Sequence, residues 1–433
     1  MQQAKTRSCP ALFLTAPASH QGKTTLTAGL ARHHRNQGRT VRVFKTGPDF
    51  LDPCILERAS GNPVYSLDLW MTGAADCRRR LHDAAADADL ILIEGSMGLF
   101  DGTPSSADLA AAFGVPVLAV IDASGMAQTF AAVAQGLSTF RPGLAFYGVV
   151  ANGVASTRHA ELLCELLPSS LRCVGTVMRD EAMTLPERHL GLVQAQEIGD
   201  LEQRIETAAA RIAVTALTDL PPPVVFAPAT QAPIPRLLAD TRIAVARDQA
   251  FSFIYPANLE LLIALGADIA FFSPLANDPL PVADAVYLPG GYPELHLDTL
   301  SASGVTKATL HAHVAASRPL FAECGGMLYL LDSLTDLAGA TAPLLGLLPG
   351  RATLQGRLAG LGLQSVELEG ETLRGHTFHY SSLQTSLAPH THARRASGTA
   401  RGEAVYRHGS IVASYLHCYF PSNPGATARL FKP

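Results

Sequence analysis

Short apolar runs of the length expected for buried strands alternate with segments of helical spacing along most of the chain. In the N-terminal half the strand-type runs are residues 11–16, 40–45, 90–94, 115–121, 147–150 and 171–177. Helical spacing is clear in residues 24–37 and 127–139. Continuous apolar runs of this kind are typical of parallel strands buried on both faces, so the pattern predicts an α/β domain with a parallel sheet.

A proline-rich segment interrupts this alternation near the middle of the chain. Residues 182–217 are polar with helical spacing, and residues 221–235 then contain prolines among small residues. We expect the proline-rich segment to contain no sheet strand and no helix interior, because proline has no N–H to donate. Strand-type runs resume afterwards, at residues 242–246, 269–272, 285–288, 319–322 and 411–415. The pattern predicts two α/β domains, residues 8–220 and 241–433, joined by a linker over residues 221–240.

Composition narrows the class of protein. The 433 residues suffice for about two to four domains, and a net charge of −4 gives no indication of a nucleic-acid or membrane-surface binder. No apolar run approaches the ~20 residues of a membrane helix. The seven cysteines include no C-x-x-C pair, which favours reduced thiols and a cytoplasmic location. The oligomeric state stays open, with a homodimer as one alternative.

The segment Pro-Ala-Ser-His-Gln-Gly-Lys-Thr-Thr, residues 17–25, follows the first strand-type run and precedes a helical segment. Backbone N–H groups at such a helix N-terminus bind phosphate, the lysine adds a cation and the first threonine suits Mg²⁺. The expected ATP-binding residues are Ser19, Gly22, Lys23, Thr24 and Thr25. Pro17 stands where the usual motif has its first glycine, and an ordinary strand-to-helix turn is the alternative.

Two acidic segments extend this candidate site. Residues 44–53 place Asp49 and Asp52 after the second strand, and residues 90–102 place Glu94 and Asp101 at and after the next one. The carboxyl ends of parallel strands are where α/β sheets bind ligands, and a carboxylate at such an end serves Mg²⁺ in phosphate-loop proteins. The alternative is that the aspartates cap the following helix and that Glu94 is a solvated strand end.

A second reactive pattern is Phe-Ala-Glu-Cys-Gly-Gly, residues 321–326, between a strand-type run and a helical segment. This predicts a nucleophile elbow with Cys324 at a helix N-terminus that lowers the thiol pKa. The N–H groups of Gly291 and Gly325 are candidates for an oxyanion hole. His417, which we place at the end of an apolar strand, is the candidate base. The alternative is that Cys324 is a buried structural residue.

One chain that consumes a nucleoside triphosphate and also splits an amide is most simply an ATP-dependent amidotransferase. Glutamine would then supply ammonia to an activated carboxylate. Two histidine pairs, His311 with His313 and His376 with His379, lack a third metal ligand at suitable spacing. For residues 376–381 a structural or substrate-lining role is favoured over metal binding.

Longer motifs carry a family resemblance. They are Lys-x-Gly-Pro-Asp-Phe-Leu-Asp-Pro (45–53), Glu-Gly-x-Met-Gly-Leu-Phe-Asp-Gly (94–102), Leu-Pro-Glu-Arg-His-Leu-Gly-Leu (185–192), Leu-Pro-Gly-Gly-Tyr-Pro-Glu (288–294) and Ser-Tyr-Leu-His (414–417). Over residues 11–420 the chain resembles the cobyrinic acid (or hydrogenobyrinic acid) a,c-diamide synthase family of cobalamin biosynthesis. The resemblance implies an N-terminal ATP-binding domain like that of dethiobiotin synthetase and a C-terminal triad-type glutaminase domain.

The resemblance also implies residue roles and substrates. Thr24, Asp49 and Glu94 would hold Mg²⁺ as the cofactor, while ATP and glutamine would be co-substrates. The corrin carboxylate and its acyl phosphate would meet Lys45, Phe50, Leu51, Asp52 and Asp101. Many triad glutaminases carry a glutamate two residues after the histidine, where this chain has Tyr419.

The implied reaction is amidation of the a and c acetates of a corrin through acyl phosphates. A cobalt-containing and a metal-free corrin both stay open as substrates. One alternative is an a,c-diamide synthase for another tetrapyrrole, nickel sirohydrochlorin. Another is a phosphate-loop switch ATPase whose glutaminase-like domain serves only for contact.

Overall fold

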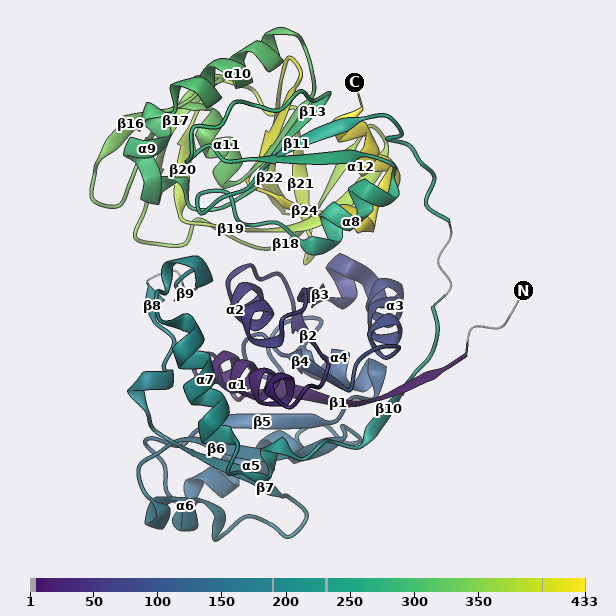
Figure 1. The fold of residues 1–433 in the computed structure, drawn as a ribbon, viewed down its shortest axis with the longest axis vertical. Coiled ribbons are helices and arrows are strands. Elements are labelled where there is room, and N and C mark those ends of the chain that lie inside the picture. The colour runs from purple at the N-terminus through teal and green to yellow at the C-terminus, as the bar shows by residue number, and fades with distance from the viewer. Residues whose placement is uncertain (1–4, 189–190, 230–232, 399, 433) are drawn as a thin grey trace. The chain divides into compact units, whose positions relative to one another are not determined.

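The computed structural model describes residues 5–188, 191–229, 233–398 and 400–432. It divides into two compact units, Met1–Gln231 and Ala232–Pro433, each an α/β structure with its own sheet (Figure 1). The predicted α/β fold class is confirmed. The two units are described separately below.

The first unit is built on a parallel sheet with the strand order β3-β2-β4-β1-β5-β6-β7. The strands are β1 (Arg7–Thr15), β2 (Val41–Thr46), β3 (Tyr65–Leu67), β4 (Leu90–Glu94), β5 (Val117–Asp122), β6 (Phe146–Val154) and β7 (Cys173–Met178). The helices are α1 (Lys23–Asn36), α2 (Leu51–Ser60), α3 (Ala74–Ala84), α4 (Ser106–Phe113), α5 (Thr129–Thr139), α6 (Thr157–Cys164) and α7 (Leu201–Ile212). The inner strands β4 and β5 are almost wholly buried, as their continuous apolar runs predicted.

Alternate residues of one strand face opposite layers of this unit. Leu12 and Leu14 of β1 belong to a buried cluster with residues of α1, α2 and α7. Ala11 and Phe13 belong to a separate cluster with residues of α3 and α4. Helices therefore cover both faces of the sheet, and the carboxyl ends of its strands are left for polar residues.

The expectation that the proline-rich segment contains no strand is wrong. Strand β10 (Pro223–Phe226) pairs antiparallel with the first residues of β1, and Pro223 lies opposite Pro10 at the end of the ladder. The strand has β1 as its one partner among the described residues. Proline is tolerated at such a position because no second strand needs its missing N–H.

The stretch that precedes β10 is also less helical than expected. Within residues 182–217 the long helix is α7 alone, accompanied by short 3₁₀ turns and the two-residue strands β8 (Glu187–Arg188) and β9 (Gly191–Leu192). Pro186, Gly191 and Gly199 fall in this part of the chain, and such residues interrupt helices. His189, in the motif of residues 185–192, lies outside the described residues.

The second unit contains a ten-stranded sheet of mixed direction with the order β12-β11-β13-β14-β23-β22-β21-β18-β19-β24. Its parallel part comprises β11 (Arg242–Ala246), β12 (Asp268–Phe272), β13 (Ala285–Leu288), β14 (Leu320–Glu323) and β23 (Ile411–Ser414). Its antiparallel part comprises β18 (Gly360–Leu368), β19 (Glu371–His379), β21 (Thr391–Arg395), β22 (Arg401–His408) and β24 (His417–Tyr419). Sequence patterning predicted the parallel strands but not the antiparallel ones.

A smaller sheet and several α-helices complete the described part of the second unit. The sheet has the order β16-β15-β17-β20, formed by β15 (Leu331–Thr335), β16 (Thr341–Pro343), β17 (Leu348–Leu354) and β20 (Ser381–Gln384). The helices are α8 (Pro256–Ala264), α9 (Leu297–Ala302), α10 (Gly304–Ala315), α11 (Gly325–Leu330) and α12 (Pro424–Phe431).

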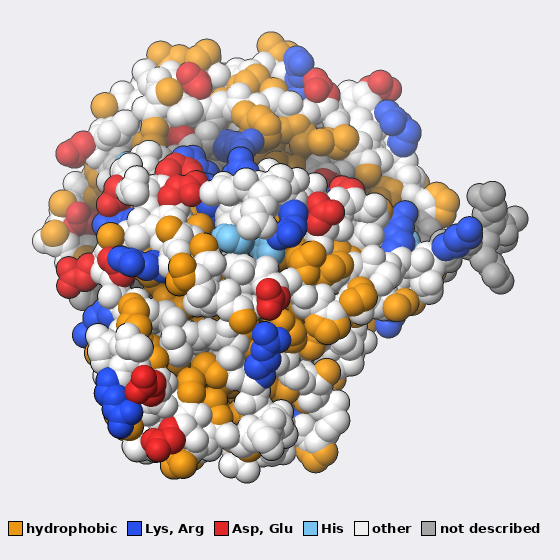
Figure 2. All heavy atoms as spheres, turned by 60° about the horizontal axis from the view of Figure 1, so that its bottom comes forward, with side chains coloured by type: hydrophobic (Ala, Val, Ile, Leu, Met, Phe, Trp, Pro, Cys, Tyr) orange, Lys and Arg blue, Asp and Glu red, His pale blue; other side chains and the backbone are white. Residues whose placement is uncertain are grey.

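Basic and acidic side chains are interspersed on the face drawn in Figure 2. Among the described residues, no helix combines the length and the apolar character that crossing a membrane requires.

Candidate active sites

The phosphate-loop segment lies between the end of β1 and the start of α1, and the ends of two further strands hold it. Asn152 of β6 donates a hydrogen bond to the carbonyl of Gln21 at 3.0 Å, and the Gln21 side chain accepts one from the N–H of Asp122 at 2.9 Å. Gly22 has φ 83, and a Cβ at this position would lie 2.2 Å from the Asn152 amide nitrogen. Only glycine therefore fits here.

Sequence analysis missed Asn152 and Asp122. The available signal was their position: Asp122 ends the apolar strand β5, and Asn152 lies near the end of β6. Ligands of parallel sheets bind at these carboxyl ends.

The other loop residues have distinct environments. Lys23 is buried and donates to the carbonyls of Ala18 at 3.0 Å and Met97 at 2.9 Å. Burial, reinforced by Lys45, lowers the pKa of Lys23 to about 8. Ser19 is exposed, and Thr25 is half-buried in the first turn of α1.

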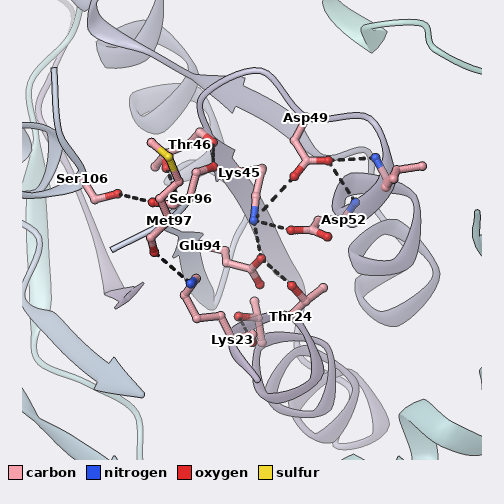
Figure 3. Close-up of polar contacts among 12 residues, drawn as sticks. Lys23, Thr24, Lys45, Thr46, Asp49, Asp52, Glu94, Ser96, Met97 and Ser106 are labelled. Atoms are coloured by element: carbon pink, nitrogen blue, oxygen red, sulfur yellow. Dashed lines mark hydrogen bonds and ion pairs between the residues drawn. The ribbon is translucent and has the colours of Figure 1, made fainter. Parts of the chain in front are cut away.

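A buried lysine links the acidic residues of this site (Figure 3). Lys45 Nζ lies 2.6 Å from Glu94 Oε1, 2.5 Å from Asp52 Oδ2 and 3.8 Å from Asp49 Oδ2. Thr24 donates its hydroxyl hydrogen to the same Glu94 oxygen at 3.0 Å. Lys45 and Glu94 lie opposite each other in the β2–β4 ladder, so the strand register itself brings them together.

Asp49 and Asp52 behave differently although they lie three residues apart. Asp49 Oδ1 accepts hydrogen bonds from the N–H groups of Leu51 at 2.8 Å and Asp52 at 3.2 Å, which caps α2. Burial and the neighbouring Asp52 raise the pKa of Asp49 to about 7. Burial opposes ionisation of Asp52 as well, but attraction to Lys45 outweighs it and the pKa of Asp52 is lowered. Asp49 thus combines the capping role with a position at the acidic cluster.

The remaining predicted residues lie around this cluster. Phe50 and Leu51 are half-buried at the start of α2. Asp101 is exposed and accepts a hydrogen bond from the N–H of Gly98 at 2.8 Å, which closes the glycine-rich loop after β4.

The donor set of the cluster fits a magnesium ion. Among the described residues, Glu94 Oε2 is buried without a hydrogen-bond partner, a state that a carboxylate rarely tolerates. The Thr24 hydroxyl contacts the other oxygen of the same carboxylate. Carboxylate and hydroxyl oxygens are the protein ligands that Mg²⁺ prefers.

In the second unit, Cys324 lies in a sharp turn between β14 and α11. Its backbone has φ 43 and ψ −109, a conformation that residues other than glycine rarely adopt. The N–H of Cys324 donates to the carbonyl of Ser414 at 2.8 Å. This strand–turn–helix is the geometry that presents a nucleophile.

Two glycine segments converge with His417 at this turn. A Cβ on Gly290 would lie 2.3 Å from His417 Cε1 and 3.4 Å from Cys324 Cβ. A Cβ on Gly325 would lie 2.9 Å from the nitrogen of Gly291. The backbone N–H groups of the predicted oxyanion hole therefore belong to segments in close contact beside the thiol.

His417 does not end the apolar strand as expected. Strand β23 stops at Ser414, and His417 begins the separate short strand β24, which pairs with β19. The His417 ring stacks on that of His376, with centroids 4.9 Å apart and planes inclined by 17°.

The pKa of the thiol differs from the expectation. Burial raises the pKa of Cys324 well above its usual value, and the hydrogen bond from Gly325 only partly opposes this. The position of Cys324 at the start of the six-residue helix α11 does not offset burial. Burial lowers the pKa of His417 to about 3, so the ring is neutral in the free enzyme.

Further polar residues surround the pair. The hydroxyl oxygen of Tyr255 lies 3.0 Å from His376 Nδ1, and His379 Nε2 lies 3.2 Å from Glu403 Oε1. His311 and His313 instead contact the carbonyls of Leu345 and Pro319. Among the described residues, no group of three His, Cys, Asp or Glu side chains could hold a metal ion, so a magnesium ion at the first site would need the Thr24 hydroxyl, phosphate oxygens or water as further ligands. Sequence analysis missed Tyr255 and Glu403, because no motif marks them and they come from distant elements, the start of α8 and strand β22.

Comparison with protein families matches both units. Residues 12–193 match the model described as the CobQ/CobB/MinD/ParA nucleotide binding domain. Residues 242–425 match the CobB/CobQ-like glutamine amidotransferase domain.

Curated relatives match over the full length. The hydrogenobyrinate a,c-diamide synthase of Stutzerimonas stutzeri (strain A1501) is 59% identical over 427 residues, covering 99% of each chain. The enzyme of the same name from Pseudomonas aeruginosa (strain PAO1) is 57% identical, covering 100% of this chain and 99% of its own. The chain belongs to the cobyrinate and hydrogenobyrinate a,c-diamide synthase family. The cobyrinate a,c-diamide synthase of Herminiimonas arsenicoxydans, at 49% identity over 436 residues, is another member.

Membership of this family confirms the resemblance given by the sequence motifs. It also confirms the enzyme class, an ATP-dependent glutamine amidotransferase that acts as a carbon–nitrogen ligase. ATP and glutamine are accordingly its co-substrates.

Proposed function

We propose that this enzyme amidates the a and c acetate carboxylates of hydrogenobyrinate or cobyrinate in cobalamin biosynthesis. The observation that carries the proposal is that the chain has both a lysine–carboxylate cluster beside a phosphate loop and a cysteine elbow beside a histidine. Relatives that share more than half of their residues with it are named for the hydrogenobyrinate reaction.

In the first unit, the loop residues Ser19, Gly22, Lys23, Thr24 and Thr25 bind the phosphates of ATP. Thr24, Asp49 and Glu94 would hold Mg²⁺, and the ion would offset the negative charge of the transferring phosphoryl group. Lys45 supplies a further cation from the buried side of the cluster. Phe50, Leu51, Asp52 and Asp101 position the substrate carboxylate, which becomes an acyl phosphate.

In the second unit, Cys324 attacks the side-chain amide carbon of glutamine while His417 accepts the thiol proton. The N–H groups of Gly291 and Gly325 bind the resulting oxyanion. The C–N bond breaks, the proton from His417 goes to the leaving nitrogen, and ammonia is released with a γ-glutamyl thioester left on Cys324. Water then hydrolyses the thioester to glutamate.

The pKa shifts of Cys324 and His417 restrict when the proton can move. Burial disfavours the charged form of both groups, so transfer of the thiol proton to His417 is unfavourable in the free enzyme. We place the transfer together with attack on the bound amide, when the N–H groups of the oxyanion hole take up the developing charge.

A phosphate-loop switch with an inactive glutaminase-like unit fits these observations less well. A contact module has no use for a strained Cys324 backbone, a neutral histidine beside the thiol and glycine at the crowded positions 290 and 325. Strain of this kind is retained where it serves chemistry.

A substrate screen tests the proposal. The purified enzyme is incubated with ATP, Mg²⁺ and glutamine and, in separate arms, with hydrogenobyrinic acid, cobyrinic acid or nickel sirohydrochlorin, and the products are read by mass spectrometry. We expect diamides from one or both corrins. Amidation of nickel sirohydrochlorin alone, or ATP hydrolysis without amidation in any arm, contradicts the proposal.

We also propose a cytoplasmic location, supported by the need for ATP and glutamine. A homodimer is the assembly to test first, by measuring the mass in solution.

A further inference from the structure

The residues next to the nucleophile and next to the base are joined by a buried hydrogen bond. Glu323 precedes Cys324, and its Oε1 accepts the main-chain N–H of Cys418, which follows His417, at 2.7 Å. The Glu323 side chain lies wholly inside the unit, with 1% of its surface exposed. The bond therefore links β14 directly to β24.

A second bond holds the other end of the same segment. The N–H of Cys324 donates to the carbonyl of Ser414 at 2.8 Å, and Glu323 lies opposite Ser414 in the β14–β23 ladder. Residues 414–418 are thus fastened to residues 323 and 324 at both ends. His417 lies inside this fastened segment, so its distance from Cys324 depends on both bonds.

Glu323 is the centre of a small polar network. Tyr287 donates its hydroxyl hydrogen to Glu323 Oε2 at 2.7 Å, and Asn258 donates to the carbonyl of Cys418 at 2.8 Å. Asn258 also accepts the N–H of Phe420 at 2.8 Å. Each end of β24 therefore meets a side chain that is anchored elsewhere in the unit.

Stability alone does not explain a carboxyl group at position 323. Burying a carboxyl requires that its hydration be replaced, and apolar residues of similar size often give equal or greater stability. The surrounding aromatic side chains, including Tyr287, Phe321 and Phe420, would accept an apolar neighbour. An apolar side chain, however, could not accept a hydrogen bond from the Cys418 N–H and so could not fix its position.

We propose that Glu323 is a positioning residue for glutamine hydrolysis: by accepting the N–H of Cys418, it keeps His417 within reach of the Cys324 thiol. The inference rests on the proposed roles of Cys324 and His417 and adds a residue that neither motif analysis nor the reaction itself points to.

Three variants test it: Glu323→Met, which keeps the size but removes the acceptor; Glu323→Gln, which keeps one oxygen for the Cys418 N–H; and Tyr287→Phe, which removes a neighbouring bond to the same carboxyl. Each is assayed for glutamine-driven amidation, for amidation driven by added ammonium salt, and for Tm. A misplaced base costs on the order of 10²-fold in rate.

We expect Glu323→Met to lower kcat with glutamine on the order of 10²-fold, with KM for glutamine and the ammonium-driven rate unchanged. Glu323→Gln should restore kcat, and Tyr287→Phe should lower Tm without lowering kcat. If Glu323→Met fails to fold, loss of kcat in Glu323→Gln overturns the proposal and retention supports it. An unchanged kcat in folded Glu323→Met, or kcat losses that follow Tm across all three variants, also overturns it.

The variants Cys324→Ser and His417→Asn separate this inference from the proposed function. If either keeps glutamine-driven amidation, the assignment of the nucleophile or base fails, and the positioning role of Glu323 fails with it. If both lose it while Glu323→Met does not, the positioning role alone is wrong.

Discussion

Lys45 of β2 donates a hydrogen bond at 2.6 Å to Glu94 of the adjacent strand β4. Both residues are almost fully buried, at 2% and 0% exposure. Asp52 and Asp49 complete the surroundings of the ammonium group. Burial opposes the charge on Lys45, but attraction to the carboxylates outweighs it and the pKa of Lys45 is raised. More carboxyl groups than ammonium groups are buried here, and a bound divalent cation would offset the remaining negative charge.

The first prediction concerns this lysine. Lys45→Met removes the cation and leaves its buried carboxylates unpaired, which typically costs about 3–5 kcal/mol of stability. We expect a lower Tm, a larger rise of Tm on adding Mg²⁺ than in the parent enzyme, and loss of amidation from either nitrogen source. Differential scanning calorimetry with and without MgCl₂ measures the first two. Arg42→Met, on the same strand but paired with exposed Asp87, is the control. Equal responses of the two variants to Mg²⁺ would contradict the prediction.

The second prediction concerns carboxylate activation. Lys23→Ala and Glu94→Gln should each abolish amidation whether nitrogen comes from glutamine or from ammonium salt, because the acyl phosphate must form before ammonia can attack. Each lost contact to a transferring phosphoryl group costs on the order of 3 kcal/mol. Product formation in both assays is the measurement. Near-normal ammonium-driven turnover in Glu94→Gln would show that the magnesium site lies elsewhere.

The third prediction separates the two reactions. Cys324→Ser should abolish glutamine-driven amidation and leave ammonium-driven amidation intact, because the thiol serves only to release ammonia. Cys77→Ser is the control for a buried cysteine, since Cys77 lies in the first unit and contacts Thr72. A folded Cys324→Ser variant that has lost both activities would refute the division of labour.

Local patterns in the sequence were sufficient to predict the strand ends that form the sites. Lys45 and Glu94 meet because each ends an apolar run, and carboxyl ends of parallel strands share one edge. The turn at Cys324 could be predicted because strand, small residues and helix are consecutive in the chain.

What the sequence could not reveal depends on contacts between distant residues. Glu323 and Cys418 are joined across the fold, and no spacing marks such a bond. Strands β18 and β22 lack long apolar runs because many of their residues are exposed or half-buried, so hydrophobic patterning did not mark them as strands. The raised pKa of Cys324 follows from burial, which tertiary packing alone determines.

The fourth prediction is a pH dependence of stability. Burial raises the pKa of Glu323 from its ordinary 4.5 to about 8. Between these values the unfolded chain has lost the proton that the folded enzyme keeps, so stability falls as pH rises through this window. Glu323→Gln cannot ionise, and its Tm should fall less between about pH 5 and about pH 9 than that of the parent enzyme. Tyr287→Phe, which keeps the carboxyl, is the control. Parallel Tm profiles for all three proteins would contradict the raised pKa.

The last prediction joins one activation site to two amides. The sequence contains a single Gly-Lys-Thr phosphate loop, so both acetates must use the same site in turn. Side chains that hold one edge of the macrocycle cannot also present the other edge, and release between the steps is the simplest way to turn it. We therefore expect a free monoamide to accumulate early and then to be consumed, with one ATP and one glutamine used for each amide. Asp52 and Asp101 should influence which acetate reacts first. A time course by liquid chromatography and mass spectrometry measures this. Diamide that forms without a lag, with no monoamide in solution even at excess substrate, would refute the release step.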